Sequence, residues 1–216
     1  MATKKQERAN DIVVRLKQMY PKAKCSLDFM NAFELLIATM LSAQSTDLRV
    51  NIVTKSLFRK YPDPRSFAEA NQVEMERDVK QTGFFRNKAK AVIAASKAIV
   101  ENHNGEVPRT MDELTALPGV GRKTANVVLS NAFKIAVGIV VDTHVTRVSA
   151  RLGLTTSDDA VKIEQDLMKL IPQKEWTSFS HRLIEHGRAV CVARKPKCAK
   201  CDLNDVCPSA EEPLGG

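Results

Sequence analysis

A short stretch that carries one proline and two glycines separates two helical patterns near the middle of the chain. It reads LPGVGRKTA and runs from Leu117 to Ala125. Upstream, Thr110 followed three residues later by Glu113 has the form of a capping box, which predicts a short helix that Pro118 ends. Downstream, apolar residues recur at helical spacing, at Ala125, Val128, Leu129 and Ala132. The sequence therefore predicts two helices joined by a tight turn.

The two glycines of this turn, Gly119 and Gly121, permit positive φ and close approach of the backbone. Amides at such a turn can point together at an anion beside the positive end of the following helix. At about 100° per residue, Lys123 lies nearly opposite the apolar stripe of that helix. A lone GxG between helices is more often an ordinary connection, and a nucleotide P-loop fits worse because it needs GxxxxGK[ST] after a strand. The residues alone leave a plain turn and an anion-binding turn open.

Helical periodicity also dominates the rest of the chain, and long alternating strand patterns are absent. Apolar spacing predicts helices around residues 12–19, 33–41, 50–58, 89–99 and 163–170, with shorter ones near 67 and 73–79. Asp142-Thr143 can cap a further helix, and Thr82-Gly83-Phe84-Phe85 predicts a turn. We therefore predict an all-α fold.

The charge of the chain narrows the class of partner. Lys and Arg number 33 against 25 Asp and Glu, which gives a formal net charge of +8. This surplus favours a polyanion such as nucleic acid, although proteins that need only solubility also carry one. Aromatic residues make up only 5% of the chain, which argues against a surface that stacks successive bases on rings. The polar start, MATKKQERAN, and the lack of a long apolar run predict a cytoplasmic protein without a membrane segment.

Four cysteines lie close together near the C-terminus. Cys191, Cys198, Cys201 and Cys207 have the spacing Cys-x6-Cys-x2-Cys-x5-Cys. So many thiols in a loop-rich span indicate a metal site, and disulfides are disfavoured in a reducing cytosol. A zinc site usually offers two close pairs of cysteines, whereas iron-sulfur clusters accept this spacing, with a proline after the last cysteine. Spacing alone leaves zinc and a cluster about equally favoured.

Several strings together resemble the endonuclease III family of helix-hairpin-helix DNA glycosylases. They are FELLIATMLSAQSTD, HNGEVP, LPGVGRKTANVVL, VDTHVTRV and HGR followed by the four cysteines. The resemblance implies a monomer with a helix-hairpin-helix, two helical lobes that enclose a DNA-binding cleft, and a [4Fe-4S] cluster on the four cysteines. It divides the chain into a helical-barrel domain at residues 25–135 and a discontinuous cluster domain at residues 1–24 plus 136–216.

The resemblance also implies two catalytic residues, because Lys123 matches the lysine of the family and Asp142 matches its aspartate. A target base must leave the duplex stack before an enzyme can reach it. A carboxylate can then stabilise the positive charge that builds on the sugar, while an amine attacks C1′ and forms a Schiff base. Without the resemblance, Lys123 reads as a solvated side chain and Asp142 as a helix cap.

Contacts to DNA are implied at Gln44, Thr82, Phe84, Gly119, Gly121, Arg122 and Lys195. Gln44 matches the residue that fills the gap left by the flipped base. The turn that holds Thr82 and Phe84 matches the loop that wedges beside the orphaned base, where the family often has aliphatic residues. Lys195 either presents a cation to a phosphate or offsets the charge of the cluster.

The leading prediction is a glycosylase and abasic-site lyase that removes oxidised pyrimidines from duplex DNA, in the nucleoid-associated cytoplasm. An adenine or mismatch glycosylase is an alternative, although Lys123 argues against relatives that lack this amine. A second alternative is a non-catalytic DNA-binding or redox iron-sulfur protein in which Lys123 only contacts phosphate.

Overall fold

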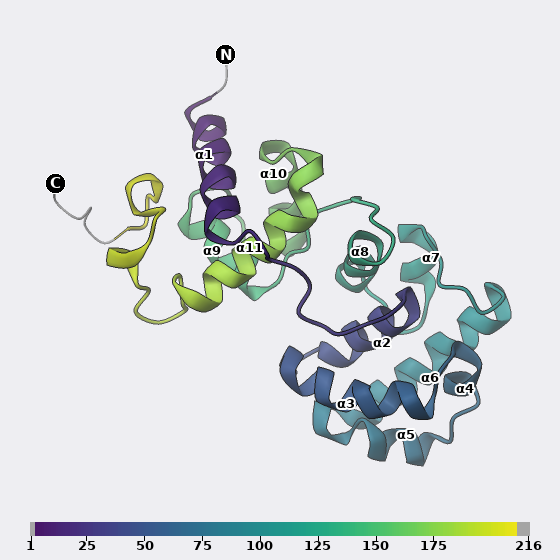
Figure 1. Cartoon of the computed structure of the whole chain (residues 1–216). Coiled ribbons are helices and arrows are strands. Elements are labelled where there is room, and N and C mark those ends of the chain that lie inside the picture. Colours follow the sequence, from purple (N-terminus) through teal and green to yellow (C-terminus); the bar gives the residue numbers. More distant parts are fainter. Residues whose placement is uncertain (1–2, 211–216) are drawn as a thin grey trace. The chain divides into compact units, whose positions relative to one another are not determined.

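The computed structural model describes residues 3–210, and within that range it contains helices and no strand. The predicted all-α fold is therefore confirmed. The chain forms two compact units (Figure 1). The first unit is Cys25–Val137, and the second combines the chain up to Lys24 with the chain from Gly138 onward. Of the helices in residues 3–210, none combines the length and the apolar character that crossing a membrane requires.

The first unit is built around α2, which has apolar residues on almost every side. Its helices are α2 Ala32–Ser42, α3 Asp47–Lys60, α4 Pro64–Ala68, α5 Gln72–Asp78, the 3-10 turn η1 Lys80–Thr82, α6 Phe85–Asn102, α7 Met111–Ala116 and α8 Arg122–Asn131. Residues 35–38 of α2 are fully buried, and α2 packs against α3, α6 and α8. A helix that is hydrophobic all round belongs in a core, where other helices can cover each of its faces.

Side chains mark where the helices of this unit begin. Asn31 Oδ1 accepts a hydrogen bond from the amide of Glu34 at 2.9 Å and so caps α2. Thr110 Oγ1 accepts one from the amide of Glu113 at 3.3 Å, which confirms the predicted start of α7. Leu117 lies just beyond the end of α7, and its side chain is buried in the core.

The second unit is built around α11. Its helices are α1 Lys4–Met19, α9 Thr143–Arg151, α10 Ala160–Leu170, η2 Gln173–Glu175, α11 Trp176–Ala189, η3 Cys198–Lys200 and η4 Asn204–Val206. Helix α11 packs against α9 and α1. The sequence did not predict α11, whose buried face mixes the apolar Phe179 and Leu183 with Ser180, Arg182 and His186.

Candidate functional site

The turn before α8 depends on one of its two glycines. Gly119 has φ of 75°, and a Cβ at this position would lie 2.9 Å from Ala91 Cβ and 3.3 Å from Met40 Cε. Only glycine therefore fits, since both the backbone angle and the close packing exclude a side chain. Gly121 has φ of −92° and open space around its Cα, so its backbone does not use the positive φ that glycine permits.

Helix α8 begins without a side-chain cap, because its N-cap residue is Gly121. Lys123 lies in the first turn and is exposed, whereas Ala125, Val128 and Leu129 are buried, as the periodicity predicts. The first amides of a helix have no partner within the helix and carry the positive end of its dipole. The start of α8 thus combines an exposed primary amine with amides suited to an anion.

Asp142 is the N-cap of α9 in the second unit, as predicted. Its Oδ1 accepts hydrogen bonds from the amides of His144 at 2.9 Å and Val145 at 2.8 Å. The other carboxylate oxygen, Oδ2, takes part in neither bond, and the residue is only half-buried. The cap fixes the direction of the carboxylate and leaves one oxygen for another role.

A second layer of contacts surrounds the start of α9. Arg147 Nη2 lies 3.2 Å from His144 Nδ1 and donates to the carbonyl of Gly187 at 2.9 Å. A Cβ at Gly187 would lie 3.0 Å from that same histidine nitrogen, so α11 approaches α9 closely here. Burial lowers the pKa of His144; the charge of Asp142 raises it, and the charges of Arg147 and Arg188 lower it further. The ring is therefore neutral at neutral pH. Arg147 and Gly187 lie in two of the strings that carry the resemblance, VDTHVTRV and HGR, but the sequence assigned no role to either residue.

The candidate DNA-contacting residues of the first unit differ in exposure. Gln44 and Phe84 are both exposed, and both have a left-handed backbone, with φ of 54° and 47°. Thr82 is only 2% exposed, and its hydroxyl donates to the carbonyl of Val79 at 2.8 Å. The turn therefore exposes the ring of Phe84 to solvent and buries the side chain of Thr82.

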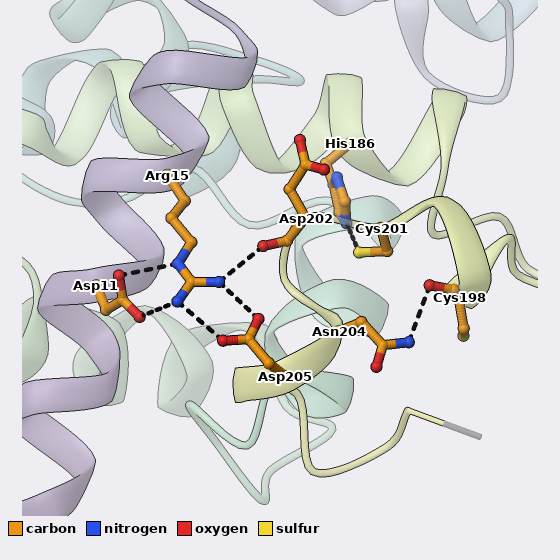
Figure 2. A network of polar contacts seen from close by, with 8 residues as sticks. All are labelled: Asp11, Arg15, His186, Cys198, Cys201, Asp202, Asn204 and Asp205. Atoms are coloured by element: carbon orange, nitrogen blue, oxygen red, sulfur yellow. Dashed lines mark hydrogen bonds and ion pairs between the residues drawn. The ribbon is translucent and has the colours of Figure 1, made fainter. Parts of the chain in front are cut away.

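The four cysteines of the cysteine loop (residues 191–207) line one cavity, together with residues that include Arg151 and His186. All four thiols are free and half-buried. Asn204 Nδ2 donates to the carbonyl of Cys198 at 2.9 Å (Figure 2), and Arg151 Nη1 donates to the sulfur of Cys191 at 3.3 Å. These bonds hold the loop in shape. Within residues 3–210, no three His, Cys, Asp or Glu side chains are grouped so that they could hold a single metal ion.

His186 lies beside the cavity, with Nε2 at 3.6 Å from Cys201 Sγ (Figure 2) and Nδ1 at 3.0 Å from the hydroxyl of Tyr20. Burial lowers the pKa of His186 to about 4, so the ring is neutral. Burial, with smaller effects from nearby acidic groups such as Cys201, raises the pKa of Tyr20 to about 12. The phenol therefore keeps its proton and can donate it to Nδ1, which leaves the imidazole proton on the nitrogen that faces the sulfur.

Basic residues surround the cysteines on the surface of the loop. Lys195 is exposed and has φ of 52°, and Arg194 beside it is also exposed. Lys197 differs from them, because its Nζ donates to the carbonyl of Ala189 at 2.9 Å. The loop thus presents cations to solvent at Arg194 and Lys195.

The chain matches the model of the HhH-GPD superfamily of base excision DNA repair proteins over residues 37–173. It is 57% identical over 211 residues to "Endonuclease III" of Synechocystis sp., an alignment that covers 98% of this chain and 96% of that relative. A solved non-covalent endonuclease III–DNA complex is similar with a TM-score of 0.91 and 45% identity, and the match covers 97% of each chain. A trapped endonuclease III–DNA covalent intermediate, an estranged-adenine complex, is similar with a TM-score of 0.91 and 45% identity over 97% of this chain and 98% of the other.

Proposed function

This chain belongs to the endonuclease III family of the HhH-GPD superfamily, and from that membership we propose how its residues act on damaged DNA. It is a base-excision repair DNA glycosylase and abasic-site lyase that binds duplex DNA. The adenine or mismatch glycosylase and the non-catalytic module are not favoured by these relatives. The substrates that we propose are oxidised pyrimidines, and the reaction takes place in the nucleoid-associated cytoplasm.

Lys123 is the proposed nucleophile, and the observation that carries this role is its exposed amine at the uncapped start of α8. Its Nζ attacks C1′ of the flipped nucleotide. The bond from C1′ to the base breaks, and the base leaves with the electron pair and takes up a proton. Loss of a proton from nitrogen and opening of the sugar ring give a Schiff base, which acidifies the C2′ proton. Removal of that proton expels the 3′ phosphate and cuts the strand.

Asp142 is the proposed carboxylate that stabilises the positive charge on the sugar as the base departs. Its Oδ1 is bound to two backbone amides, so the side chain needs no reorganisation when charge develops. Its Oδ2 is the oxygen that would face the sugar. Because the cap is part of the fold, this charge is preorganised before DNA binds.

The cysteine loop is the proposed site of a [4Fe-4S] cluster, which would be held by Cys191, Cys198, Cys201 and Cys207. Four free thiols that line a common cavity suit a cluster with one thiolate at each iron. A single zinc ion instead needs all its sulfur ligands about 2.3 Å from one point. When bound, the cluster would cross-link the loop and so hold its basic surface rigid, which lets Lys195 contact a phosphate.

The proposed DNA contacts divide by chemistry. Gly119 lets the chain turn, and the first amides of α8 after Gly121, with Arg122, bind a phosphate at the positive end of the helix. The amide after Gly119 is used within the turn, since Val120 donates to the carbonyl of Leu117. Gln44 enters the gap that the flipped base leaves, and Phe84 wedges beside the orphaned base. Thr82 contributes through the backbone of the same turn, since its side chain is buried.

Covalent trapping tests this function. Incubation of the protein with an abasic-site duplex and sodium borohydride should give a stable protein–DNA adduct, because the reductant fixes the Schiff base. A protein that binds the duplex but forms no adduct would be a DNA-binding module and not a lyase. Elemental analysis tests the cluster: stoichiometric zinc without iron would contradict it, whereas iron with inorganic sulfide would support it.

A further inference from the structure

Lys88 is a buried lysine near the start of α6 whose partners are neutral. The residue is 7% exposed, and Nζ donates to two backbone carbonyls, those of Leu41 and Thr82, at 2.7 Å each. Burial lowers its pKa from the ordinary lysine value. A buried amine without a carboxylate partner weakens a fold unless its hydrogen bonds offset the loss of water. The hydrogen bonds to the two carbonyls therefore offset the cost of burying the amine, and they link Lys88 to the two segments that contain Leu41 and Thr82.

The carbonyl of Leu41 lies in the last turn of α2. That turn contains no basic residue, so Lys88 supplies the cation at the negative end of the helix from a different helix. Three residues farther on lies Gln44, which is exposed and left-handed. The position of Gln44 therefore depends on how the end of α2 is held.

The carbonyl of Thr82 lies in the turn before α6. Lys88 makes two hydrogen bonds to this turn, because its backbone amide also donates to the carbonyl of Phe84 at 3.1 Å. The two bonds fall on either side of Gly83, which has φ of 72°. Phe84, exposed and left-handed like Gln44, is thus held by the same residue that holds the end of α2.

We infer that Lys88 is a positioning residue that fixes the Gln44 loop and the Phe84 turn relative to each other, so that both side chains enter the duplex together as the target base leaves it. The inference rests on the proposed function, since it takes Gln44 and Phe84 as the inserting residues. Non-glycine residues in the left-handed region are held there only by surrounding structure. The amine of Lys88 supports both left-handed residues, because it is hydrogen-bonded to the end of α2 before Gln44 and to the turn that holds Phe84.

The experiment compares Lys88→Met with Lys90→Met. Lys90 lies on the same helix and is exposed, so its substitution removes the same charge without removing a bond to the two carbonyls. Base extrusion is read with a fluorescent base analogue at the target position of a duplex. Schiff-base chemistry is read separately by borohydride trapping on a single-stranded abasic oligonucleotide, which has no partner base and no gap to fill.

Lys88→Met should reduce extrusion by roughly tenfold or more, as expected when a positioned group is displaced by about 1 Å. Trapping on the single strand should stay within about twofold of wild type, since extrusion is not needed there. Lys90→Met should match wild type in both readouts. In the Gln44→Ala background, Lys88→Met should add much less than it does alone, because a residue that acts through Gln44 has less to lose once Gln44 is gone.

Two results would overturn the inference. One is equal extrusion by Lys88→Met and Lys90→Met, and the other is an equal loss of extrusion and single-strand trapping, which would assign Lys88 to the fold alone. If Lys88→Met does not fold, Lys88→Gln replaces it, because its shorter amide keeps a polar group but reaches only one carbonyl. That variant should lose extrusion while trapping survives, and wild-type extrusion by it would also refute the role. Failure of the wild-type protein to form any adduct would instead overturn the proposed function.

Discussion

Arg15 and Asp205 join α1 to the cysteine loop through two parallel hydrogen bonds (Figure 2). Arg15 Nη1 lies 2.6 Å from Asp205 Oδ1, and Nη2 lies 3.0 Å from Oδ2. The same guanidinium donates to Asp11 one turn earlier on α1 and to the carbonyl of Asp202. The hydrogen bond from Arg15 holds the pKa of Asp205 below its usual range. Because Asp202 and Asp205 lie between the last two cysteines, one arginine fixes this part of the loop from outside it.

The first prediction is that Arg15→Met will speed the loss of bound metal to a chelator. An exposed ion pair contributes little to global stability, so the main effect should be local opening of the loop. Lys5→Met is the control, since it removes one positive charge from an exposed position on the same helix. Release is measured by the decay of visible absorbance under excess chelator. Equal release rates in the two variants would show that the contacts of Arg15 do not restrain the cysteine loop.

The second prediction concerns the two glycines of the hairpin turn. Gly119→Ala should lower the free energy of unfolding by about 2 kcal/mol, because it combines a left-handed backbone with a clash against Ala91. Gly121→Ala should cost less than about 1 kcal/mol, because its backbone is extended and its surroundings are open. Urea unfolding at constant slope measures both values. Similar midpoints for the two variants would contradict this difference.

The sequence predicts the helices that have apolar stripes and polar caps, and the reason is physical. The stripe of α8 and the caps at Thr110 and Asp142 are local signals that tertiary packing did not override. Helix α11 was not predicted, because Arg182 and His186 occupy its buried face. Arg182 pairs there with Glu175 just before the helix, and His186 pairs with Tyr20, which is distant in sequence. Periodicity counts apolar residues and does not register a buried polar residue that has found a partner.

The candidate site, too, could be predicted from the sequence only in part. Motifs locate Lys123, Asp142 and the four cysteines, because each motif is contiguous or has short spacing. Lys88 gave no signal, since a lysine in the first turns of a helix is usually solvated, and its two carbonyl partners come from separate segments. The different backbone angles of Gly119 and Gly121 were equally hidden, because glycine permits both conformations.

The third prediction concerns acid stability and the ion pair between Arg182 and Glu175. Arg182 Nη1 lies 2.7 Å from Glu175 Oε2, and both side chains are largely buried. Burial raises the pKa of Glu175, but the hydrogen bond and charge of Arg182 outweigh it and hold the pKa below the ordinary value. The stability from this pair is therefore fully present above the unfolded pKa of about 4.3 and is lost as pH falls through the lower folded pKa.

Glu175→Gln should remove that pH dependence. At neutral pH it should lower the free energy of unfolding by about 1–3 kcal/mol, because Arg182 keeps a hydrogen-bond acceptor but loses its counter-charge. The difference between variant and wild type should shrink as the pH is lowered below about 4. Urea unfolding measured between neutral and acid pH gives both quantities. A difference that stays constant with pH would show that Glu175 titrates normally in the folded protein.

The last prediction separates the two proposed catalytic roles. Lys123→Gln should reduce borohydride trapping and strand cleavage to background, since no amine remains at that position to form the imine. The fold and binding to an abasic duplex should survive, because the side chain is exposed and lies off the buried face of α8.

Asp142→Asn should slow base release by about a hundredfold or more, the scale of losing one preorganised stabilising group. It should still cap α9, because the asparagine oxygen can accept the same two amides. Cleavage at a preformed abasic site should suffer less than base release, because the bond to the base is already gone. The two variants should thus fail at different steps, read by single-turnover assays on a duplex with an oxidised pyrimidine and on an abasic duplex. Trapping of Lys123→Gln on the abasic duplex at the wild-type level would mean that another amine is the nucleophile.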